Sequence, residues 1–175
     1  MTFAEMRALI AEDYRANGSD WTRPGFRTLA WHRFGNWRMG VRSPILRAPL
    51  SLLYRWGFRH CRNVYGIELP YTATIGHGVV IEHQGGIVVH GASVIGDGAI
   101  IRQNCTLGLR SLDALDDAPI IGKRVNIGAG AVIMGRVLIG DDAAIGANAV
   151  VMCNVPAGAL AVGVPATIKQ RVQAS

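Results

Sequence analysis

Three side chains in the middle of the chain have the types and spacing of an acid–base site. Glu68 stands in the run YGIELP, and Glu82 and His83 are adjacent in the run IEHQGG. A carboxylate that binds one imidazole nitrogen fixes the tautomer and leaves the other nitrogen free to act as a base. Fifteen residues separate Glu68 from His83, which is close to one full turn of the coil inferred below. The spacing is compatible with a base that takes a proton from a hydroxyl group and equally with an ordinary corner histidine.

Two further histidines, His77 and His90, raise the question of a metal site, because imidazole is a common zinc ligand. They stand six and seven residues from His83, which places the three rings on successive sides of a three-sided coil. We therefore expect no metal site within one chain. Ligands shared between subunits are the alternative.

The elements that must position these residues are short repeats. From Ile75 to Pro156, with Leu69 upstream, an aliphatic residue, usually followed by glycine or another small residue, returns about every six residues. The positions are Leu69, Ile75, Ile81, Ile87, Ile95, Ile101, Leu107, Ile121, Ile127, Ile133, Ile139, Ile145 and Val151. Neither a helix nor a simple strand alternation has a period of six. Such repeats are typical of a β-solenoid, in which each repeat buries its apolar side against its neighbours.

This pattern predicts a mainly β fold whose chain coils through three short strands per turn. Positions eighteen residues apart then stack, so we expect Ile121 on Ile139, Ile127 on Ile145, and the region after Ala157 on Ile139. The register slips between Ile87 and Ile95 and again between Leu107 and Ile121. Extra residues in a solenoid leave the coil as loops, which often carry function. We expect residues 110–118 to form such a loop.

The N-terminal third predicts helices. Thr2 is a candidate cap for a first helix that stops at Asn17 and Gly18. A second helix is expected from about Pro24 to Gly40, and a third after Ser43 and Pro44. We divide the chain into a helical segment at 1–64, a β-helix domain at 65–168 and a C-terminal tail at 169–175.

The helical segment is basic and aromatic. It holds eleven of the eighteen basic residues, four of the twelve acidic residues and all four tryptophans. One interpretation is a cap that packs on the coil and on other subunits. A second is attachment to an anionic membrane surface. Nucleic acid is not expected as a partner, because no binding motif accompanies the charge.

Composition sets the remaining bounds. The sequence contains no run of about eighteen apolar residues, so we expect no membrane-spanning helix. The first thirty residues do not resemble a secretory signal. The three cysteines are too scattered for a disulfide framework, and we expect Cys105 and Cys153 to be buried thiols. We expect a cytoplasmic protein. If the helical segment attaches to a membrane, we expect it to contact the inner face.

Several runs together resemble the serine acetyltransferases, a family of left-handed hexapeptide-repeat acyltransferases. The runs are VYGIE at 64–68, ATIG at 73–76, EHQGGIVV at 82–89, QNCTLG at 103–108, NIGAGA at 126–131 and VGVPA at 162–166. The N-terminal runs AEDYRA at 11–16 and WHRFGNW at 31–37 are also similar, although this part looks shorter than in full-length enzymes. The resemblance implies a left-handed parallel β-helix, acetyl-CoA as acetyl donor, no metal, and a homotrimer or dimer of trimers with active sites between neighbouring coils.

The resemblance also implies roles for individual residues. His83 is the expected catalytic base and Glu68 the carboxylate that orients it. Glu82 stands at the position that contacts the acceptor. Apart from the resemblance, we also expect Asp13, Asp116, Asp117 and Arg110 to bind the acceptor. The residues expected to contact coenzyme A are Gly108, Ala129, Gly130, Ala147, Gly163, Pro165, Ala166 and Lys169, with Arg171 as the alternative to Lys169 near the phosphates. The backbone N–H of Gly108 is also a candidate donor to the oxyanion.

One departure from the family pattern concerns the acceptor. Serine enzymes have an Arg-His pair that holds the carboxylate of serine, and the corresponding positions here are Asp117 and Ala118. An aspartate repels a carboxylate and lacks the paired donors of arginine. We therefore expect a sugar hydroxyl of a polysaccharide or its precursor as the acceptor, with serine as the alternative.

Two other classes of function stay open on the sequence. A metal enzyme similar to the γ-type carbonic anhydrases uses the same kind of coil. A structural coil without catalysis would bind a partner and would be indifferent to His83→Ala.

Overall fold

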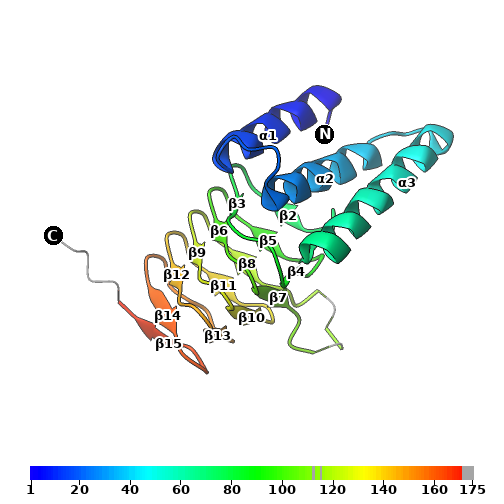
Figure 1. Ribbon diagram of the computed structural model, residues 1–175. Helices are drawn as coiled ribbons and strands as arrows, with labels where there is room; N and C mark the ends of the chain where they lie inside the picture. The colour runs from blue at the N-terminus through cyan, green and yellow to red at the C-terminus, as the bar shows by residue number, and fades with distance from the viewer. Residues whose placement is uncertain (112, 115, 171–175) are drawn as a thin grey trace.

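The computed structural model describes residues 1–111, 113–114 and 116–170. Three helices precede a coil of short strands and lie at its N-terminal end (Figure 1). They are α1 (Phe3–Ala16), α2 (Pro24–Met39) and α3 (Pro44–His60), and α3 continues into a π-helical turn, η1 (Cys61–Tyr65). The three helices expected from the sequence are confirmed. None of the helices in the described part of the chain is long and apolar enough to cross a membrane.

The helix ends follow the local sequence signals. The Thr2 hydroxyl accepts the backbone N–H of Glu5, and the Glu5 carboxylate accepts the backbone N–H of Thr2, at 3.2 and 2.8 Å. This reciprocal capping box satisfies two N–H groups that the helix itself leaves unpaired. Pro24 and Pro44 occupy the first turns of α2 and α3, where their missing N–H costs little.

The coil has three sheets, one for each side. Sheet A contains β1 (Ile67–Glu68), β4 (Ile87–Val89), β7 (Thr106–Gly108), β10 (Val132–Met134) and β13 (Val150–Val151). Sheet B contains β2 (Thr74–Ile75), β5 (Val94–Ile95), β8 (Ile120–Ile121) and β11 (Leu138–Ile139). Sheet C contains β3 (Val80–Ile81), β6 (Ile100–Ile101), β9 (Asn126–Ile127), β12 (Ala144–Ile145), β14 (Leu160–Val162) and β15 (Thr167–Lys169). All neighbours pair in parallel except β14 and β15, so the predicted left-handed parallel β-helix with N-terminal helices is confirmed.

The interior of the coil is a column of aliphatic side chains. Most strands point one branched residue inward and the neighbouring residue outward. The inward residues include Ile67, Ile87, Ile101, Ile121, Ile133 and Val151, all at most 1% exposed. Burying such a side chain contributes about 1.5–3 kcal/mol, so the stack accounts for much of the stability of the coil. Small residues such as Ala99 and Ala143 fill the corners.

The number of residues per turn varies along the coil and is largest in the second turn, where Ile95 pairs with Ile121 twenty-six residues later. Ile75 pairs with Ile95 twenty residues later, and Ile121 pairs with Ile139 eighteen residues later. Ile139 then pairs with Val155, only sixteen residues later. The stacking of Ile121 on Ile139 is therefore confirmed, whereas the residue above Ile139 is Val155 and not one after Ala157.

All of this variation lies in the connections from sheet A to sheet B. The connection from β7 to β8 is the longest, and its described residues project from the coil as a loop (Figure 1), as expected for residues 110–118, of which Leu112 and Leu115 lie outside the described residues. The connections from sheet B to sheet C and from sheet C to sheet A keep the six-residue spacing. The first inward residue of sheet A is Ile67, which pairs with Ile87, and not Leu69 as the six-residue pattern suggested. Cys153 lies on the surface after β13 and is exposed, contrary to expectation, whereas Cys105 is buried.

The helices cover the first edge of the coil with buried polar side chains. β2 and β3 are end strands of sheets B and C, so their outer backbone groups have no strand neighbour. Asn17 at the end of α1 donates to the Val79 carbonyl and accepts the Ile81 N–H, both at 3.1 Å. These bonds replace the strand pairing that an exposed sheet edge would otherwise offer to another chain.

Arg33 and His32 of α2 serve the same edge. The Arg33 guanidinium donates to the carbonyls of Ile75 and Gly76 at 2.7 and 2.6 Å. His32 Nε2 lies 2.9 Å from the Ala73 carbonyl, so this nitrogen must carry the proton and donate. The helical layer is thereby fixed to the coil through specific hydrogen bonds.

Candidate active site

His83 lies at the corner that connects sheet C to sheet A, two residues after β3. This corner stacks on the segment that enters β1. The Gly85 N–H donates to the Tyr65 carbonyl and the Ile87 N–H donates to the Gly66 carbonyl, both at 2.9 Å. Gly66 has a φ of +66°, and a Cβ there would lie 3.1 Å from the Gly85 Cα, so glycine is required for this approach.

These bonds join the His83 corner to Tyr65 and Gly66 and not to Glu68, so the expected stacking of Glu68 and His83 on adjacent levels of one corner stays a prediction. Their side chains, however, form no hydrogen bond with each other, and neither forms a side-chain hydrogen bond or ion pair with another described residue. Glu68 points outward from β1, where its register partner is Val88. The orienting role of Glu68 thus stays a prediction that requires the two side chains to approach.

Glu82 has a partner that the sequence analysis did not identify. Its carboxylate lies 2.7 Å from Nε of Arg102, and Arg102 also donates to the side chain of Asn126. Arg102 stands twenty residues after Glu82, the same spacing that separates Ile81 from its register partner Ile101. A twenty-residue first turn would have revealed this pair, whereas the assumed eighteen residues concealed it.

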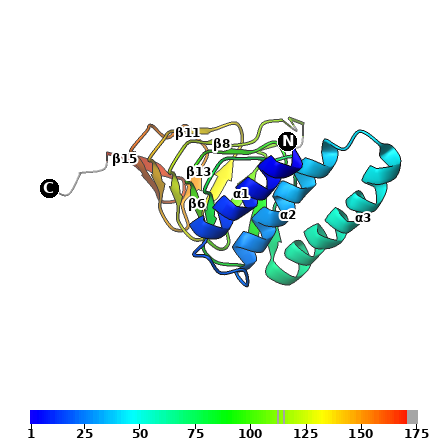
Figure 2. The ribbon, with the colours of Figure 1, turned by 90° about the horizontal axis from the view of Figure 1, so that it is seen from above.

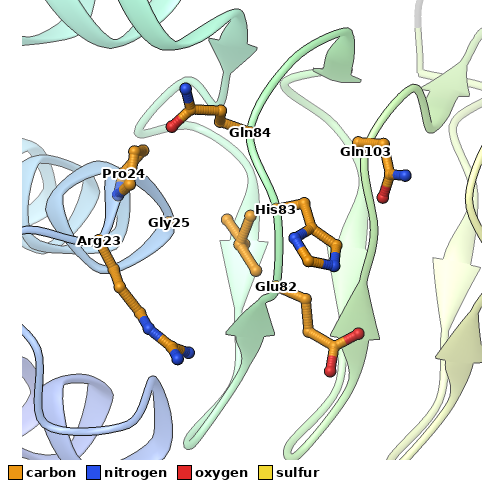
Figure 3. Close-up of a pocket in the computed structure, with 8 residues that line it drawn as sticks. Arg23, Pro24, Gly25, Glu82, His83, Gln84 and Gln103 are labelled. Atoms are coloured by element: carbon orange, nitrogen blue, oxygen red, sulfur yellow. The ribbon is translucent and has the colours of Figure 1, made fainter.

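A cavity of about 410 Å³ opens beside His83. Glu82, His83 and Gln84 line one side and Gln103 extends the wall from the next turn, while Arg23 and Pro24 face them from the start of α2 (Figure 3). α2 approaches closely here, because a Cβ on Gly25 would lie 2.2 Å from the Ile81 carbonyl oxygen. The cavity therefore joins a candidate base to acidic, basic and amide side chains, a suitable set for a polar acceptor.

The corner that holds His83 continues as a column along the whole coil. The Asn104 N–H donates to the Gly85 carbonyl, the Gly130 N–H to Gln103, and the Asn148 N–H to Ala129, at 2.8–2.9 Å. The Val150 N–H then donates to the Gly163 carbonyl at 3.0 Å. Ala129, Gly130 and Ala147, three of the expected coenzyme A residues, all lie in this column. Ala129 and Gly130 are half-buried and Ala147 is exposed, so these three residues form an accessible strip of small residues that begins away from His83.

The C-terminal residues expected to contact coenzyme A lie at the far end of this strip. The Ala166 N–H donates to the Val150 carbonyl at 2.8 Å, which fixes the turn that contains Gly163 and Pro165. Lys169 belongs to β15 and is exposed. Arg171 lies outside the described residues.

The remaining expected residues, apart from Asp13, lie at the opposite side of sheet A, the edge where its strands end. Gly108 ends β7, and Arg110, Asp116 and Asp117 belong to the loop that follows it. Because the strands of sheet A are parallel, each runs from the His83 column to this second edge. Within one chain these residues at the end of sheet A therefore do not lie next to His83. Ala118, one of the two departures from the family pattern, is buried in the coil at 3% exposure.

Asp13 is a correction to the expected acceptor site. Its side chain is fully buried between α1 and α2, where both carboxylate oxygens bind Arg33, at 2.9 and 3.2 Å. Burial raises the pKa of the Asp13 carboxyl, and the Arg33 guanidinium acts in the opposite direction. With no exposed surface, this carboxylate stabilises the helical layer and does not reach an acceptor.

The histidines do not converge. His77 Nδ1 binds the Glu12 carboxylate at 2.8 Å, and His90 Nδ1 accepts the Ala92 N–H at 3.3 Å. They lie at other corners than His83, as the spacing predicted. Within the described residues, no group of three or more His, Cys, Asp or Glu side chains is arranged to hold a metal ion.

Comparisons with known proteins point to one family. Residues 118–152 match the family model "Bacterial transferase hexapeptide (six repeats)". A serine acetyltransferase of Helicobacter pylori J99 is 36% identical over 143 residues, covering 82% of this chain and 80% of the relative. A serine acetyltransferase of Synechococcus elongatus is 33% identical over 148 residues, covering 85% of this chain. The chain spans only 58% of that relative's length.

A third relative matches almost end to end. The Escherichia coli K12 protein named "Putative colanic acid biosynthesis acetyltransferase WcaB" is 37% identical over 165 residues, covering 91% of this chain and 98% of the relative. Among solved structures, soybean serine acetyltransferase complexed with serine has a TM-score of 0.81 and 32% identity, covering 95% of this chain and 70% of that one. A serine acetyltransferase complex with CoA has a TM-score of 0.80 and 30% identity, covering 95% and 71%.

Proposed function

Because this chain belongs to the serine acetyltransferase family of hexapeptide-repeat transferases, we propose that it transfers the acetyl group of acetyl-CoA to an acceptor hydroxyl. The observation that carries the proposal is the column of small residues from the His83 cavity to the Gly163 turn. It offers an extended ligand a strip of backbone and small side chains that ends at a candidate base. The related structure that holds CoA supports the choice of ligand.

The proposed reaction is a direct transfer. His83 takes the proton of the acceptor hydroxyl as its oxygen attacks the thioester carbonyl. The tetrahedral intermediate collapses, the carbon–sulfur bond breaks, and the coenzyme A sulfur receives the proton from His83. Glu68 is the proposed orienting carboxylate, and the Gly108 N–H the proposed donor to the oxyanion.

Serine is the acceptor that the comparisons favour, rather than the sugar expected from the sequence. Relatives named serine acetyltransferase cover most of this chain, and the soybean structure holds serine. Arg110 is then the candidate to bind the serine carboxylate, because Asp117 cannot do so.

A sugar hydroxyl is the second candidate, and two observations favour it. The Escherichia coli relative whose name refers to colanic acid matches 98% of its own length, which the Synechococcus serine enzyme does not. Asp117 also replaces the arginine that the family uses for the serine carboxylate, and aspartates suit sugar hydroxyls.

We also propose that the active site forms between copies of the chain, in a trimer or dimer of trimers. The support is the separation of the candidate residues over the two edges of sheet A. A neighbouring coil that presents its Gly108 edge to the His83 column would join the two groups.

The cytoplasmic location expected from the sequence likewise stays a proposal.

The test is coenzyme A thiol release from acetyl-CoA, with L-serine, monosaccharides and nucleotide sugars compared as acceptors. His83→Ala should lower kcat/KM by about 10²–10⁴ with the active acceptor, because that is the usual contribution of a general base. His77→Ala is the matched control and should retain activity, because His77 lies at the corner between sheets B and C. Glu68→Gln should lower kcat without changing the KM for acetyl-CoA.

The outcomes separate the alternatives. Turnover with serine alone supports the serine reading, and turnover with a sugar alone supports the polysaccharide reading. Full activity of His83→Ala would refute the proposed base. A protein that does not bind coenzyme A would refute the acyltransferase proposal altogether.

A further inference from the structure

The outer face of α3 carries exposed apolar side chains. Ile45, Leu46, Leu52 and Trp56 are 83%, 63%, 60% and 62% exposed, and Leu53 is 47% exposed. Positions 45, 49, 52, 53 and 56 recur with helical spacing, so they share one side of the helix. α3 has seventeen residues and is about 25 Å long, so this arc forms a continuous apolar strip.

The opposite face of α3 is already occupied. Tyr54 and Gly57 are buried against α2, and the Tyr54 hydroxyl also accepts the N–H of Tyr71, between β1 and β2, at 3.0 Å. A Cβ on Gly57 would lie 2.2 Å from the indole of Trp31, so the two helices are in close contact. α3 lies at one end of the helical layer, next to α2 (Figures 1 and 2). The ring of Trp56 contacts Trp31 of α2 at the border of the apolar strip and is still 62% exposed.

The surroundings of the strip are positively charged. From position 21 to position 67 the sequence contains nine arginines and no acidic residue. Four of them, Arg42, Arg55, Arg59 and Arg62, are exposed on or beside α3. None of the ion pairs among the described residues involves any of these four.

We propose that α3 is a docking face for an anionic lipid surface. In this arrangement the helix lies in the plane of the interface, with Leu52 and Trp56 inserted below the headgroups and the arginines at the level of the lipid phosphates. An apolar arc bordered by basic residues, with an interfacial tryptophan, is the pattern of helices that bind in this way.

The charge argues against a contact in which two copies of the chain meet through the same α3 face. Two copies that met through α3 would bring two acid-free, arginine-rich faces together without compensating carboxylates. A lipid surface with negative headgroups supplies the missing charge, and each arginine near such a surface increases the binding constant about fivefold.

The docking face is independent of the chemistry proposed for His83. It lies on the helical layer, whereas the candidate base and the strip of small residues lie on the coil. Failure of lipid binding would therefore leave the acetyltransferase proposal intact, and the reverse also holds.

The experiment is flotation of the full chain with vesicles of phosphatidylcholine alone or with 30% phosphatidylglycerol. The wild type should bind the anionic vesicles at least tenfold more tightly than the neutral ones, and 0.5 M salt should weaken binding because it screens the arginines. Leu52→Gln with Trp56→Gln should reduce binding at least tenfold. Arg55→Gln with Arg59→Gln should reduce it about twenty-fivefold, from the fivefold factor of each arginine.

Two control variants change similar residues elsewhere. Leu138→Gln alters an apolar side chain of the coil that is 52% exposed, and Arg136→Gln removes an exposed arginine of the coil. Both should bind vesicles like the wild type. Equal binding to neutral and anionic vesicles, or equal loss in α3 and control variants, would overturn the proposal.

The oligomeric state tests the other possible occupant of the apolar strip, a second copy of the chain. If the Leu52→Gln/Trp56→Gln variant changes the molar mass in light scattering while vesicle binding is unaffected, the strip is an interface between copies and the lipid proposal is wrong. If vesicle binding falls at unchanged molar mass, with circular dichroism showing the same helix content, the proposal is supported.

Discussion

At the scale of single residues, the Glu82–Arg102 pair distinguishes the cavity beside His83. The side chains are 37% and 30% exposed, so the pair is neither buried nor fully hydrated. Arg102 holds the Glu82 carboxylate in one orientation next to the candidate base, and the two charges together set the electrostatic field that an acceptor meets. Arg102 is therefore a candidate positioning residue for acceptor binding.

Replacing Arg102 by glutamine should raise the KM for the acceptor about three- to tenfold, which corresponds to the loss of roughly 1 kcal/mol from a partly exposed pair. The KM for acetyl-CoA should not change, because the strip of small residues is unaffected. Steady-state kinetics with both substrates varied gives the two constants.

Arg124→Gln is the control, because Arg124 pairs with Asp142 at another corner of the coil. The positioning role is refuted if Arg102→Gln and Arg124→Gln have the same kinetic constants.

At the scale of elements, the central feature is the contact between the helices and the first turn of the coil. A parallel coil leaves an unpaired edge at its first strands, and the helices satisfy that edge through Asn17, His32 and Arg33. Arg33 carries its charge into this contact, so Asp13 is needed to neutralise it. The stability of the coil thus depends on ionisable groups in the helices.

Asp13→Asn should lower the free energy of unfolding by about 3 kcal/mol, because it leaves the buried Arg33 charge without a counter-ion. The KM for the acceptor should stay unchanged in the folded variant. Urea unfolding followed by circular dichroism measures the first quantity, and kinetics the second.

Asp20→Asn is the matched control, since Asp20 lies on the surface and binds Thr22. It should lose less than about 1 kcal/mol. A rise in acceptor KM for Asp13→Asn without a loss of stability would restore Asp13 to the acceptor site.

The buried ring of His32 should make the free energy of unfolding depend on pH. Burial lowers the pKa of His32 from 6.5 to about 4, so the folded protein holds the ring neutral. Between these values the unfolded chain binds a proton that the folded chain does not, and stability is lost as the pH falls from about 6.5 towards 4. The loss reaches about 3 kcal/mol at the lower end.

Urea midpoints measured at pH 7, 6 and 5 test this expectation against His32→Gln. The variant should show a weaker decrease, because glutamine does not titrate. The Asp13 carboxyl, whose pKa is raised by burial, acts with the opposite sign over the acidic range and is present in both proteins. Identical slopes for wild type and variant would refute the role of His32.

At the scale of the whole molecule, the two edges of sheet A hold different parts of the candidate site. His83, Ala129 and Ala147 lie along one edge, while Gly108 and Asp117 lie at the other. A sheet of parallel strands separates the two groups in every chain. Activity should therefore depend on the contact between chains.

Light scattering should give a molar mass of three or six times the chain mass of 18.8 kDa. Specific activity should fall on dilution at the concentration where the mass falls, because the site loses its second edge. A fully active monomer would refute the shared site.

The sequence by itself determined the coil, the helices and the location of the candidate base. The six-residue return of residues such as Ile121, Ile127 and Ile133 depends only on strand length and corner length, and these are local properties. The helix ends followed from Thr2, Pro24 and Pro44 for the same reason. The corner of His83 was predictable because the Gly85-Gly86 pair next to it marks a turn.

The tertiary structure alone decided which distant residues meet. The Glu82–Arg102 pair depends on a first turn of twenty residues, which the later eighteen-residue repeat does not predict. The burial of Asp13 depends on how α1 and α2 pack over the end strands of the coil, and no local pattern encodes that packing. The separation of Gly108 from His83 depends on the direction of all strands in sheet A, which is a property of the closed coil as a whole.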